Sequence, residues 1–329
     1  MLVTVVVVNF NGRAYLRRCL DSLACQTVEH EVIVVDNDSS DGSTELVRSQ
    51  YPNVRLILLR RNAGFAAANN IGAREAHGRY IAFLNNDTEV TANWLDCLLN
   101  GLKQNPNAGF AASRIVYLQD RSVVDSAGDV VTRSGGAFKR GHGKSAEEFS
   151  EPAEIFGACG AACLFQHDVF FEVGGFDENF FLVFEDVDLS YRAQLLGYQC
   201  QYVPDAVVAH AGSAAIGRVS RMAIYYGQRN IEWVYLKNTP TGLLVLTFPC
   251  HVVYLIASAI YHAAIGALGP FATGKWAALG GSLRVLRQRR VIQRSRRLSS
   301  VALWRRLDRG WIVRKIAEKR FDLDLAGKP

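Results

Sequence analysis

Residues 31–43, EVIVVDNDSSDGS, contain a short apolar run that ends in a cluster of Asp, Asn and Ser side chains. Three similar runs, rich in Val, Ile and Leu, occupy residues 2–8, 54–59 and 79–84. Runs of this length and composition are typical of strands that are buried on both faces of a sheet. The sequence therefore predicts four buried strands, of which residues 31–36 form the second.

Helical patterns separate these runs. Segments 13–25, 41–50 and 64–77 carry apolar residues at helical spacing, and Asp41 is the expected N-cap of the second segment, with Glu45 in its first turn. Alternation of strands and helices at this spacing indicates βαβ units. We therefore expect an α/β fold with a mostly parallel central sheet.

Each predicted strand is followed by Asn or Asp: NFNG at 9–12, DNDSS at 36–40, RNAG at 61–64 and NNDT at 85–88. Taken singly, such clusters are common turns, because Asn and Asp bond their own backbone. Ligands of open α/β sheets bind at the carboxyl ends of the strands, and four polar ends on one edge indicate a single site. Neither a dinucleotide-binding glycine motif nor a P-loop occurs, which argues against those nucleotide sites.

Six segments carry a resemblance to a known family: residues 5–12, 34–43, 62–70, 84–88, 174–181 and 185–192. In this order they are similar to the family 2 glycosyltransferases with the GT-A fold. The likeness is strongest to bacterial rhamnosyltransferase-like enzymes of cell-surface polysaccharide synthesis, including O-antigen synthesis. It covers roughly residues 3–240, and it implies a GT-A catalytic domain over 1–240.

The resemblance implies a divalent cation, Mg²⁺ or Mn²⁺, that neutralises a departing diphosphate. The Asp-x-Asp position of the family is Asn85-Asn86-Asp87 here, so the first carboxylate is missing. Asp87 is the expected metal ligand, and His210 matches a position that often completes the site. An imidazole beside a carboxylate favours Mn²⁺ more than oxygen ligands alone would.

Three acids, Glu185, Asp186 and Asp188, stand just before the helical pattern 189–196. Acids are favoured at a helix N-terminus, but three exceed what a cap requires. Close carboxylates raise one another's pKa, which suits a general base. By resemblance Asp186 is the base and Glu185 orients the acceptor, while Asp188 is expected to be a structural cap.

The donor site that the resemblance implies includes Asp36, which would bind the pyrimidine ring or the ribose. Asn9 and Asn62 would lie against the base and ribose, and Gly64 would allow close backbone approach. Residues 157–160, GACG, match a small-residue strand under the acceptor or pack tightly for structural reasons. The remaining candidate donor-binding residues are Asn85, Asn86 and Arg229, the last of which reaches a diphosphate or forms a salt bridge within the fold.

The second half of the chain contains an uncharged segment from Asn238 to Gly274. Residues 241–269 exceed the roughly 20 residues of a membrane span, although Pro249 and His251 interrupt them. A single span would separate the basic tail from the catalytic body, against the positive-inside tendency. We expect a re-entrant hairpin or an in-plane helix, and the alternative is a buried helical pair of a soluble fold.

Charge is distributed unevenly along the 329 residues. Residues 241–329 hold sixteen basic and four acidic residues, a net charge of +12, whereas residues 1–240 have a net charge of −6. Arg284, Arg287, Arg289 and Arg290 interleave with apolar residues at helical spacing, as in helices that lie on anionic membranes. No base-reading module occurs, so we expect a membrane partner rather than nucleic acid. Region 241–329 is thus predicted to be helical and membrane-associating.

Seven cysteines without a Cys-x-x-Cys pair argue against a disulfide framework and a zinc ribbon, and the chain opens on an apolar strand rather than a signal peptide. We expect a peripheral or monotopic protein at the cytoplasmic face of the cell membrane. The expected activity is metal-dependent, inverting transfer of a sugar such as L-rhamnose from a dTDP- or UDP-sugar to a polyprenyl-diphosphate-linked saccharide. The alternatives are a polyisoprenyl-phosphate sugar transferase of the same fold and an inactive nucleotide- or membrane-binding scaffold.

Overall fold

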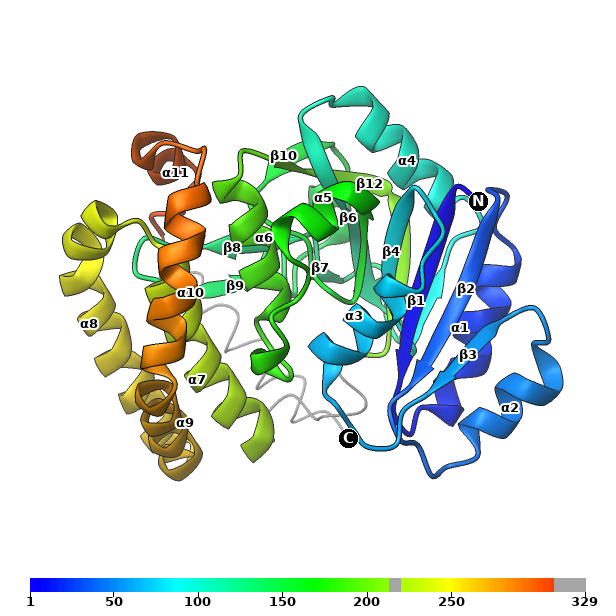
Figure 1. Cartoon of the computed structure of the whole chain (residues 1–329), viewed down its shortest axis with the longest axis horizontal. Coiled ribbons are helices and arrows are strands. Elements are labelled where there is room, and N and C mark those ends of the chain that lie inside the picture. Colours follow the sequence, from blue (N-terminus) through cyan, green and yellow to red (C-terminus); the bar gives the residue numbers. More distant parts are fainter. Residues whose placement is uncertain (213–219, 311–329) are drawn as a thin grey trace.

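The computed structural model describes residues 1–212 and 220–310, which form a central sheet with helices on both faces (Figure 1). The strands of the described chain run in the order β10-β12-β6-β11-β4-β1-β2-β3, while β5 pairs with β12 and β7 with β6. A separate hairpin consists of β8 and β9. The strands are β1 (Val3–Asn9), β2 (His30–Asp36), β3 (Arg55–Leu58), β4 (Tyr80–Asn85), β5 (Thr88–Val90), β6 (Ala108–Tyr117), β7 (Val124–Ser126), β8 (Asp129–Val131), β9 (Ala137–Lys139), β10 (Ala153–Ile155), β11 (Ala162–Gln166) and β12 (Gln199–His210).

The four strands predicted from the apolar runs are present and form one parallel half of the sheet. Strand β1 pairs in parallel with β2 and β4, and β2 pairs in parallel with β3. Their polar carboxyl ends therefore meet at one edge, as expected. The prediction of burial on both faces is wrong for β3, because this strand lies at the border of the sheet and Leu58 is 46% exposed.

The other half of the sheet contains antiparallel pairs, so the sheet as a whole is mixed and not mostly parallel. Strand β11 lies antiparallel between β4 and β6, and β5, β7 and β10 also pair antiparallel with their neighbours. Most of these added strands are only three residues long, so they leave little hydrophobic pattern in the sequence. The α/β class is as predicted, with parallel pairing concentrated in the N-terminal half.

Helices cover both faces of the sheet. One core packs α1 and α4 against the sheet, and a second core packs α3, α5 and α6 against the opposite face. The helices are α1 (Arg13–Ala24), α2 (Ser43–Gln50), α3 (Phe65–Arg74), α4 (Trp94–Gln104), α5 (His167–Val173), α6 (Glu185–Leu195), α7 (Arg221–Asn238), α8 (Thr241–Ala264), α9 (Leu268–Gly280), α10 (Ser282–Ser295) and α11 (Ser300–Arg306), with the short 3₁₀ turns η1 (Ala146–Phe149) and η2 (Glu178–Phe180).

The N-terminus of α2 differs from its prediction by one residue. Gly42, with a φ of 80°, is the N-cap, and Asp41 precedes it. The Asp41 carboxylate accepts hydrogen bonds from the backbone N–H and the hydroxyl of Ser43. Asp41 therefore still satisfies a free backbone donor of the first turn, although it is not the cap itself.

A third core joins the C-terminal helices to the catalytic body. It contains Tyr191 of α6, Trp233 of α7, Ala278 of α9, Val285 of α10 and Leu303 of α11. The described part of the predicted 241–329 region is thus helical and packs on α6 and α7, while residues 311–329 lie outside the described residues. The boundary at residue 240 stays a prediction.

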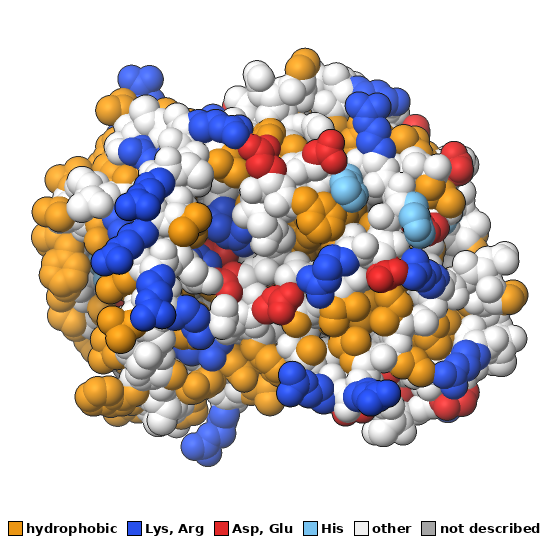
Figure 2. Space-filling view, viewed as in Figure 1, with side chains coloured by type: hydrophobic (Ala, Val, Ile, Leu, Met, Phe, Trp, Pro, Cys, Tyr) orange, Lys and Arg blue, Asp and Glu red, His pale blue; other side chains and the backbone are white. Residues whose placement is uncertain are grey.

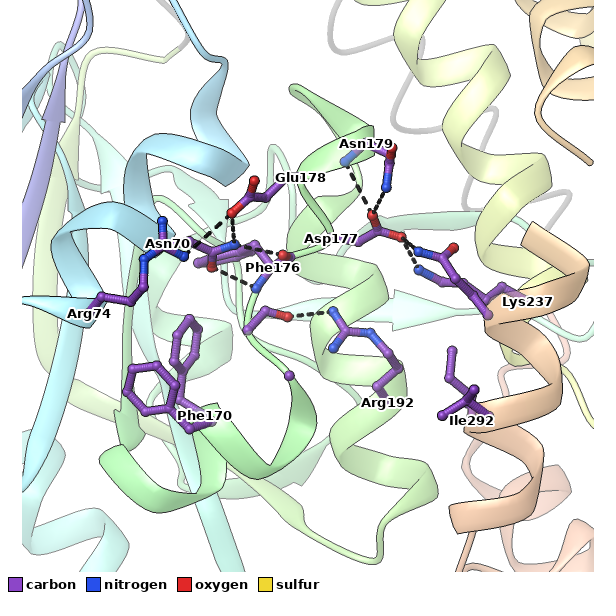
Figure 3. Close-up of a pocket in the computed structure, with 15 residues that line it drawn as sticks. Asn70, Arg74, Phe170, Phe176, Asp177, Glu178, Asn179, Arg192, Lys237 and Ile292 are labelled. Carbon is purple, nitrogen blue, oxygen red and sulfur yellow. Dashed lines mark hydrogen bonds and ion pairs between the residues drawn. The ribbon is translucent and has the colours of Figure 1, made fainter. Parts of the chain in front are cut away.

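A buried ionic cluster connects α7 to the segment that precedes α6 (Figure 3). Lys237 is 1% exposed, and its Nζ lies 2.7 Å from Asp177 Oδ2 and 2.8 Å from Asp188 Oδ1. The Nε of Arg192 also donates to Asp188, at 2.8 Å. Burial would raise the pKa of Asp177, but the Lys237 ammonium outweighs it and holds that pKa well below the ordinary value.

Replacing Lys237 should therefore destabilise the fold. Lys237→Met leaves buried carboxylates without their shared cation, and we expect the free energy of unfolding at pH 7 to fall by about 3–5 kcal/mol. The stabilisation of Asp177 is present above its unfolded pKa of about 3.9 and is lost as pH falls through the lower folded pKa. Urea denaturation should thus show a smaller difference between the two proteins at pH 3 than at pH 7.

The matched control is Lys103→Met, which removes a lysine from the exposed side of the last turn of α4. This substitution should change the free energy of unfolding by less than about 0.5 kcal/mol. Equal stability of the two variants would contradict the role given to Lys237.

Candidate functional site

Amide side chains connect the carboxyl ends of β1, β2 and β4. Asn86 donates to Asn9 at 2.7 Å, and Asn9 donates to Asp36 at 2.9 Å. Asn9 is fully buried and its side chain positions Asp36, while its predicted place against the base and ribose stays a prediction. Gly12 is required beside this chain, because a Cβ there would lie 1.9 Å from Asn86 Nδ2.

The loop after β3 is joined to the same edge through a residue that sequence reasoning missed. Asn37 donates to Asn62 Oδ1 at 2.9 Å and accepts a hydrogen bond from the backbone N–H of Ala63. Gly64 follows with a φ of 85°, and a Cβ there would lie 2.7 Å from the carbonyl oxygen of Phe181. In the structure the backbone at Gly64 approaches Phe181, while the approach to a donor that was predicted for Gly64 stays a prediction.

Asp87 and His210, the two predicted metal ligands, meet at the end of β12. His210 Nε2 lies 3.2 Å from Asp87 Oδ1, and the backbone N–H of Ala211 donates to the carbonyl of Asp87. On the other side of the ring, His210 Nδ1 lies 2.7 Å from Asp125 Oδ2. Sequence reasoning missed Asp125, which is fully buried on β7.

Asp125 also forms an ion pair with a lysine side chain. The Nζ of Lys139, on β9, donates to Asp125 at 2.8 Å. Burial would raise the pKa of Asp125, but Lys139 and His210 outweigh burial and hold this pKa well below its usual range. Burial would likewise lower the pKa of His210, but Asp87 and Asp125 raise it to about 9. Asp125 is therefore ionised and fixes the orientation of the imidazole.

The arrangement fits a divalent cation. With Nδ1 directed at Asp125, Nε2 of His210 points toward Asp87 and has no hydrogen-bond partner among the described residues. A carboxylate oxygen and an imidazole nitrogen thus converge, and a second carboxylate orients the ring, as is usual for metal-binding histidines. Within residues 1–212 and 220–310 no three His, Cys, Asp or Glu side chains are arranged so that together they could hold a metal ion, so a bound diphosphate would have to complete the coordination.

The predicted base and its neighbour begin α6. Asp186 accepts from the backbone N–H of Gly160 and of Val187, both at 2.8 Å, whereas Glu185 Oε2 is buried without a hydrogen bond among the described residues. Burial raises the pKa of Glu185 well above its usual value and the charge of Asp186 raises it further; burial also raises the pKa of Asp186. The better-bonded Asp186 is the carboxyl that ionises more readily.

Glycines 157 and 160 lie against this helix. A Cβ at Gly157 would lie 2.7 Å from the Ser190 side chain, and one at Gly160 would lie 3.2 Å from that of Asp186. Small residues here allow α6 and the Asp186 carboxylate to approach. The predicted cap role of Asp188 is wrong, because Asp188 pairs with Lys237 and Arg192 in the ionic cluster and Phe184 is the N-cap.

A strained turn presents these acids. Phe181, Val183 and Phe184 all have positive φ, between 65° and 70°, a conformation that non-glycine residues rarely adopt. Asn230 of α7 binds this turn, because its Nδ2 lies within 3.0 Å of the carbonyl oxygens of Phe180, Leu182 and Val183. Asn230 is therefore a positioning residue for the turn.

Arg229 supports the same turn. Its Nη2 donates to the carbonyl oxygens of Asn179 and Phe180 at 2.9 and 2.8 Å, and its guanidinium lies over the rings of Tyr226 and Trp233. Among the described residues it forms no salt bridge with a carboxylate, so this predicted alternative is wrong. These carbonyl contacts are made by Nη2 alone, and the second predicted role, diphosphate binding, stays a prediction.

Backbone contacts connect the metal-ligand pair to the base. The N–H of Asn85 donates to the carbonyl of Ala161 at 2.9 Å, and the preceding residue, Gly160, holds Asp186. Asp87 in turn bonds Ala211 beside His210. The segment 85–87 therefore has the predicted base on one side and the predicted metal ligand His210 on the other.

A pocket of about 710 Å³ lies elsewhere, between α3, α5, η2 and α10 (Figure 3). None of the predicted catalytic, donor-binding or metal-binding residues lines it. Its cations Arg74, Arg192 and Lys237 are already paired with acids. This pocket is therefore not the candidate site.

Comparison with known proteins agrees with this geometry. The sequence profile of Glycosyl transferase family 2 matches residues 4–174, just over half of the chain. An N-acetylglucosaminyl-diphospho-decaprenol L-rhamnosyltransferase of Mycobacterium tuberculosis is 30% identical over 264 residues, which cover 72% of this chain and 85% of the relative.

Solved structures share the fold. S. aureus TarS in complex with UDP has a TM-score of 0.56 at 17% identity, covering 89% of this chain and 88% of that one. A mannosyltransferase of Pyrobaculum calidifontis in complex with GDP-Man and Mn²⁺ has a TM-score of 0.51 at 21% identity, covering 92% and 87%. The GT-A fold that the resemblance implies is confirmed.

The Asn230 contacts generate a prediction. Asn230→Ala removes the amide donor from the carbonyl oxygens of Leu182 and Val183 and one of the two side-chain donors to that of Phe180. We expect a loss of about 1–3 kcal/mol in the free energy of unfolding. Hydrogen–deuterium exchange should rise in peptides covering residues 180–186 and stay unchanged over 30–36. Asn100→Ala, on the exposed face of α4, is the control, and unchanged exchange over 180–186 in Asn230→Ala would refute the contact's importance.

Proposed function

This chain belongs to glycosyl transferase family 2, and from that premise we propose an inverting, metal-dependent transfer of a sugar to a lipid-linked saccharide. The donor is a dTDP- or UDP-sugar, with L-rhamnose as the first candidate, and the acceptor is a saccharide on a polyprenyl diphosphate. The family match and the relative that acts on a diphospho-decaprenol acceptor support this proposal. The product would serve cell-surface polysaccharide synthesis, including O-antigen.

One observation carries the proposal: residues 85–87 connect the Asp87–His210 pair on one side to Asp186 on the other. Such a site has one end suited to a diphosphate and the other suited to a hydroxyl that must lose a proton. A binding scaffold needs no carboxyl of raised pKa at the second end. Transfer chemistry accounts for both ends.

The chemical step follows from these roles. The acceptor hydroxyl oxygen attacks the anomeric carbon as Asp186 takes the hydroxyl proton, and the bond from that carbon to the diphosphate oxygen breaks. The nucleoside diphosphate leaves with the bonding electron pair, and a single displacement inverts the anomeric configuration. Glu185 would donate a hydrogen bond from a protonated carboxyl to orient the acceptor, a state that its raised pKa favours.

Asp87 and His210 would hold the cation, Mg²⁺ or Mn²⁺, which supplies positive charge to the departing diphosphate. Asp36, positioned by Asn9, would accept a hydrogen bond from the nucleoside. Asn62, Gly64, Asn85, Asn86 and Arg229 keep their predicted donor-side roles as proposals.

The proposed acceptor carries a polyprenyl chain, so the reaction would take place at the cytoplasmic face of the membrane. The protein would attach there as a peripheral or monotopic protein, with no nucleic-acid partner. The basic C-terminal region supports this location, because its charge suits anionic headgroups.

Transfer itself tests the proposal. We expect purified protein with Mn²⁺, a dTDP- or UDP-sugar and a polyprenyl-diphosphate saccharide to release nucleoside diphosphate and form a longer lipid-linked saccharide, measured by mass spectrometry. Asp186→Asn removes the proton acceptor and should lower turnover by about 10²-fold or more while leaving donor affinity nearly unchanged. Asp168→Asn, on the exposed start of α5, is the isosteric control.

The pH profile of kcat/KM gives a second view of the base. Because burial raises the pKa of Asp186, activity should be lost as pH falls in a limb above about pH 4. Glu185→Gln keeps a neutral hydrogen-bond donor in the place of the protonated carboxyl, so the limb should keep its position. Turnover that is unchanged by substitution of both acids would refute the mechanism. No turnover with any acceptor would favour the scaffold alternative.

Metal binding is tested without turnover. Titration of Mn²⁺, followed by the electron paramagnetic resonance signal of free Mn²⁺ in the presence of nucleoside diphosphate, should give an affinity that Asp87→Asn and His210→Ala each lower by roughly 10-fold or more. Asp38→Asn, an exposed acid at the end of β2, is the control. Unchanged Mn²⁺ affinity in both ligand variants would exclude this pair as the metal site.

A further inference from the structure

Helix α8 (Thr241–Ala264) has its amphipathic character reversed relative to a helix on a soluble protein. Its buried positions are Leu243, Thr247, His251, Tyr254, Ser258 and His262, which fall three or four residues apart and form one stripe. Five of these six side chains carry a polar atom. In water-soluble proteins the buried stripe of a surface helix is apolar and the polar face is outside.

The buried stripe is bonded to the catalytic body. His251 Nε2 lies 2.9 Å from Glu232 of α7, and His251 Nδ1 lies 2.8 Å from the carbonyl oxygen of Ser134. The hydroxyls of Thr247 and Tyr235 are 2.8 Å apart, and the His251 ring stacks on that of Tyr235 at 4.0 Å. These contacts hold α8 against α7 and the β8–β9 hairpin along its N-terminal half.

The outward face of α8 is apolar. Thirteen of the eighteen large hydrophobic side chains exposed among the described residues lie in α8–α11, namely Val245, Leu246, Phe248, Val253, Ile256, Ile260, Leu268, Trp276, Leu279, Leu283, Leu286, Val291 and Val301. Figure 2 shows hydrophobic side chains covering the edge of the molecule where Figure 1 places α8. Contiguous exposed apolar surface of this kind marks an interaction site.

Cations accompany this apolar surface. Arg284, Arg287, Arg290 and Arg294 are exposed on α10, and Figure 2 shows a column of Lys and Arg side chains beside the apolar edge. Between Glu232 and Asp308 the sequence contains no acid. Arg289 does not belong to the exposed set, because it donates to the carbonyl oxygens of Leu236 and Thr239.

We propose that α8 is an in-plane membrane helix, with its apolar face in the outer acyl region of an anionic bilayer and the α10 arginines on the phosphate headgroups. Apolar burial plus basic side chains at the margin is the combination by which interfacial helices bind. This goes beyond the proposed function, since it names how the chain binds the bilayer and does not depend on which sugar is transferred.

Length and composition alone would allow α8 to cross the membrane, because its 24 residues include a window with a mean hydropathy of 2.1. A crossing would break the His251–Glu232 and Thr247–Tyr235 contacts and expose the polar stripe to lipid. It would also separate α8 from α9 and α10, both of which pack on α7 through Ala278 and Val285. The in-plane position keeps every one of these contacts.

A second copy of the chain is a less suitable occupant than a bilayer. Two copies that met through the α8 edge would bring their α10 arginine columns together, and the described residues of α8–α10 contribute no acid to pair with them. Like charges at one interface oppose association. An anionic bilayer neutralises the same arginines.

Two exposed cysteines provide matched probe sites. Cys250 is exposed on α8, and Cys25 is exposed at the end of α1, at the opposite end of the molecule (Figure 1). The full chain with Cys97→Ser and one of these two cysteines replaced by Ser can be labelled with NBD at the other. On vesicles of phosphatidylglycerol and phosphatidylcholine, NBD at Cys250 should brighten and shift to the blue, while NBD at Cys25 should not change.

Quenching depth separates an in-plane helix from a crossing one. Cys250 lies near the middle of α8, so a crossing helix would put its label near the bilayer centre. We expect lipids with a nitroxide at carbon 5 to quench the Cys250 label more than lipids with a nitroxide at carbon 12. Stronger quenching at carbon 12 would overturn the in-plane position.

Substitutions separate the two contributions to binding. Ile256→Asp combined with Ile260→Asp should lower vesicle partitioning by about tenfold or more, whereas Leu58→Asp, a comparably exposed apolar residue on β3, should not. Arg287→Glu combined with Arg290→Glu should weaken binding roughly tenfold on anionic vesicles and leave binding to neutral vesicles unchanged.

Other outcomes would refute the proposal. Full-length protein that fails to float with anionic vesicles at low salt has no membrane surface here, and sugar transfer to a soluble acceptor analogue would show that the enzyme was nevertheless intact. A Cys250 signal that depends on protein concentration without vesicles would assign the apolar face to a second copy. Either result would leave the proposed transferase activity standing.

Discussion

The geometry of the proposed catalytic acids depends on one buried ammonium group. Asp177 and Asp188 bracket the segment that contains Glu185 and Asp186, and both carboxylates bind Lys237 of α7. Burying such charges is costly unless they are paired, so the two ends of the segment are held at one point. The residues between them must then form a closed turn, and three of them adopt left-handed backbone conformations. Helix α7 thus determines the position of the base without contributing a carboxylate to it.

Asn86 occupies the variable middle position of the Asp-x-Asp motif, and its amide side chain has a structural role at this edge of the sheet. Asn86 donates to Asn9, and Asn9 in turn donates to Asp36, so the side chains between Asp87 and Asp36 link three strands. The amide of Asn86 fixes the direction of the chain just before Asp87. Asn85 contributes through its backbone, which bonds Ala161 and Thr88. The missing carboxylate at position 85 therefore leaves the connection to Asp186 in place.

Sequence alone predicted the parallel half of the sheet. Its strands appear as continuous apolar runs, and each run is followed directly by a polar cluster. It also named Asp87, His210, Glu185 and Asp186, which the structure brings together in the pairs expected. Asp125 was missed because it acts on His210, 85 positions away, and long-range pairing leaves no local pattern. The contact of Asn230 with Val183, 47 positions away, left no pattern for the same reason. The short antiparallel strands were missed for a related reason, since three residues carry too little periodicity. The salt bridge that was the alternative role of Arg229 was wrong, because its partners are backbone carbonyls, which no sequence displays.

The left-handed turn has a consequence for biosynthesis. Phe181, Val183 and Phe184 together cost on the order of several kcal/mol of backbone strain, which the carbonyl contacts of Asn230 offset. A nascent chain that has emerged only through α6 lacks Asn230, Arg229 and Lys237, so its turn relaxes and Glu185 and Asp186 are not held in place. The ribosome must therefore release α7 before the acids reach their final positions. A partly synthesised or prematurely ended chain can form the edge of the sheet that carries Asp36 while Glu185 and Asp186 remain unrestrained.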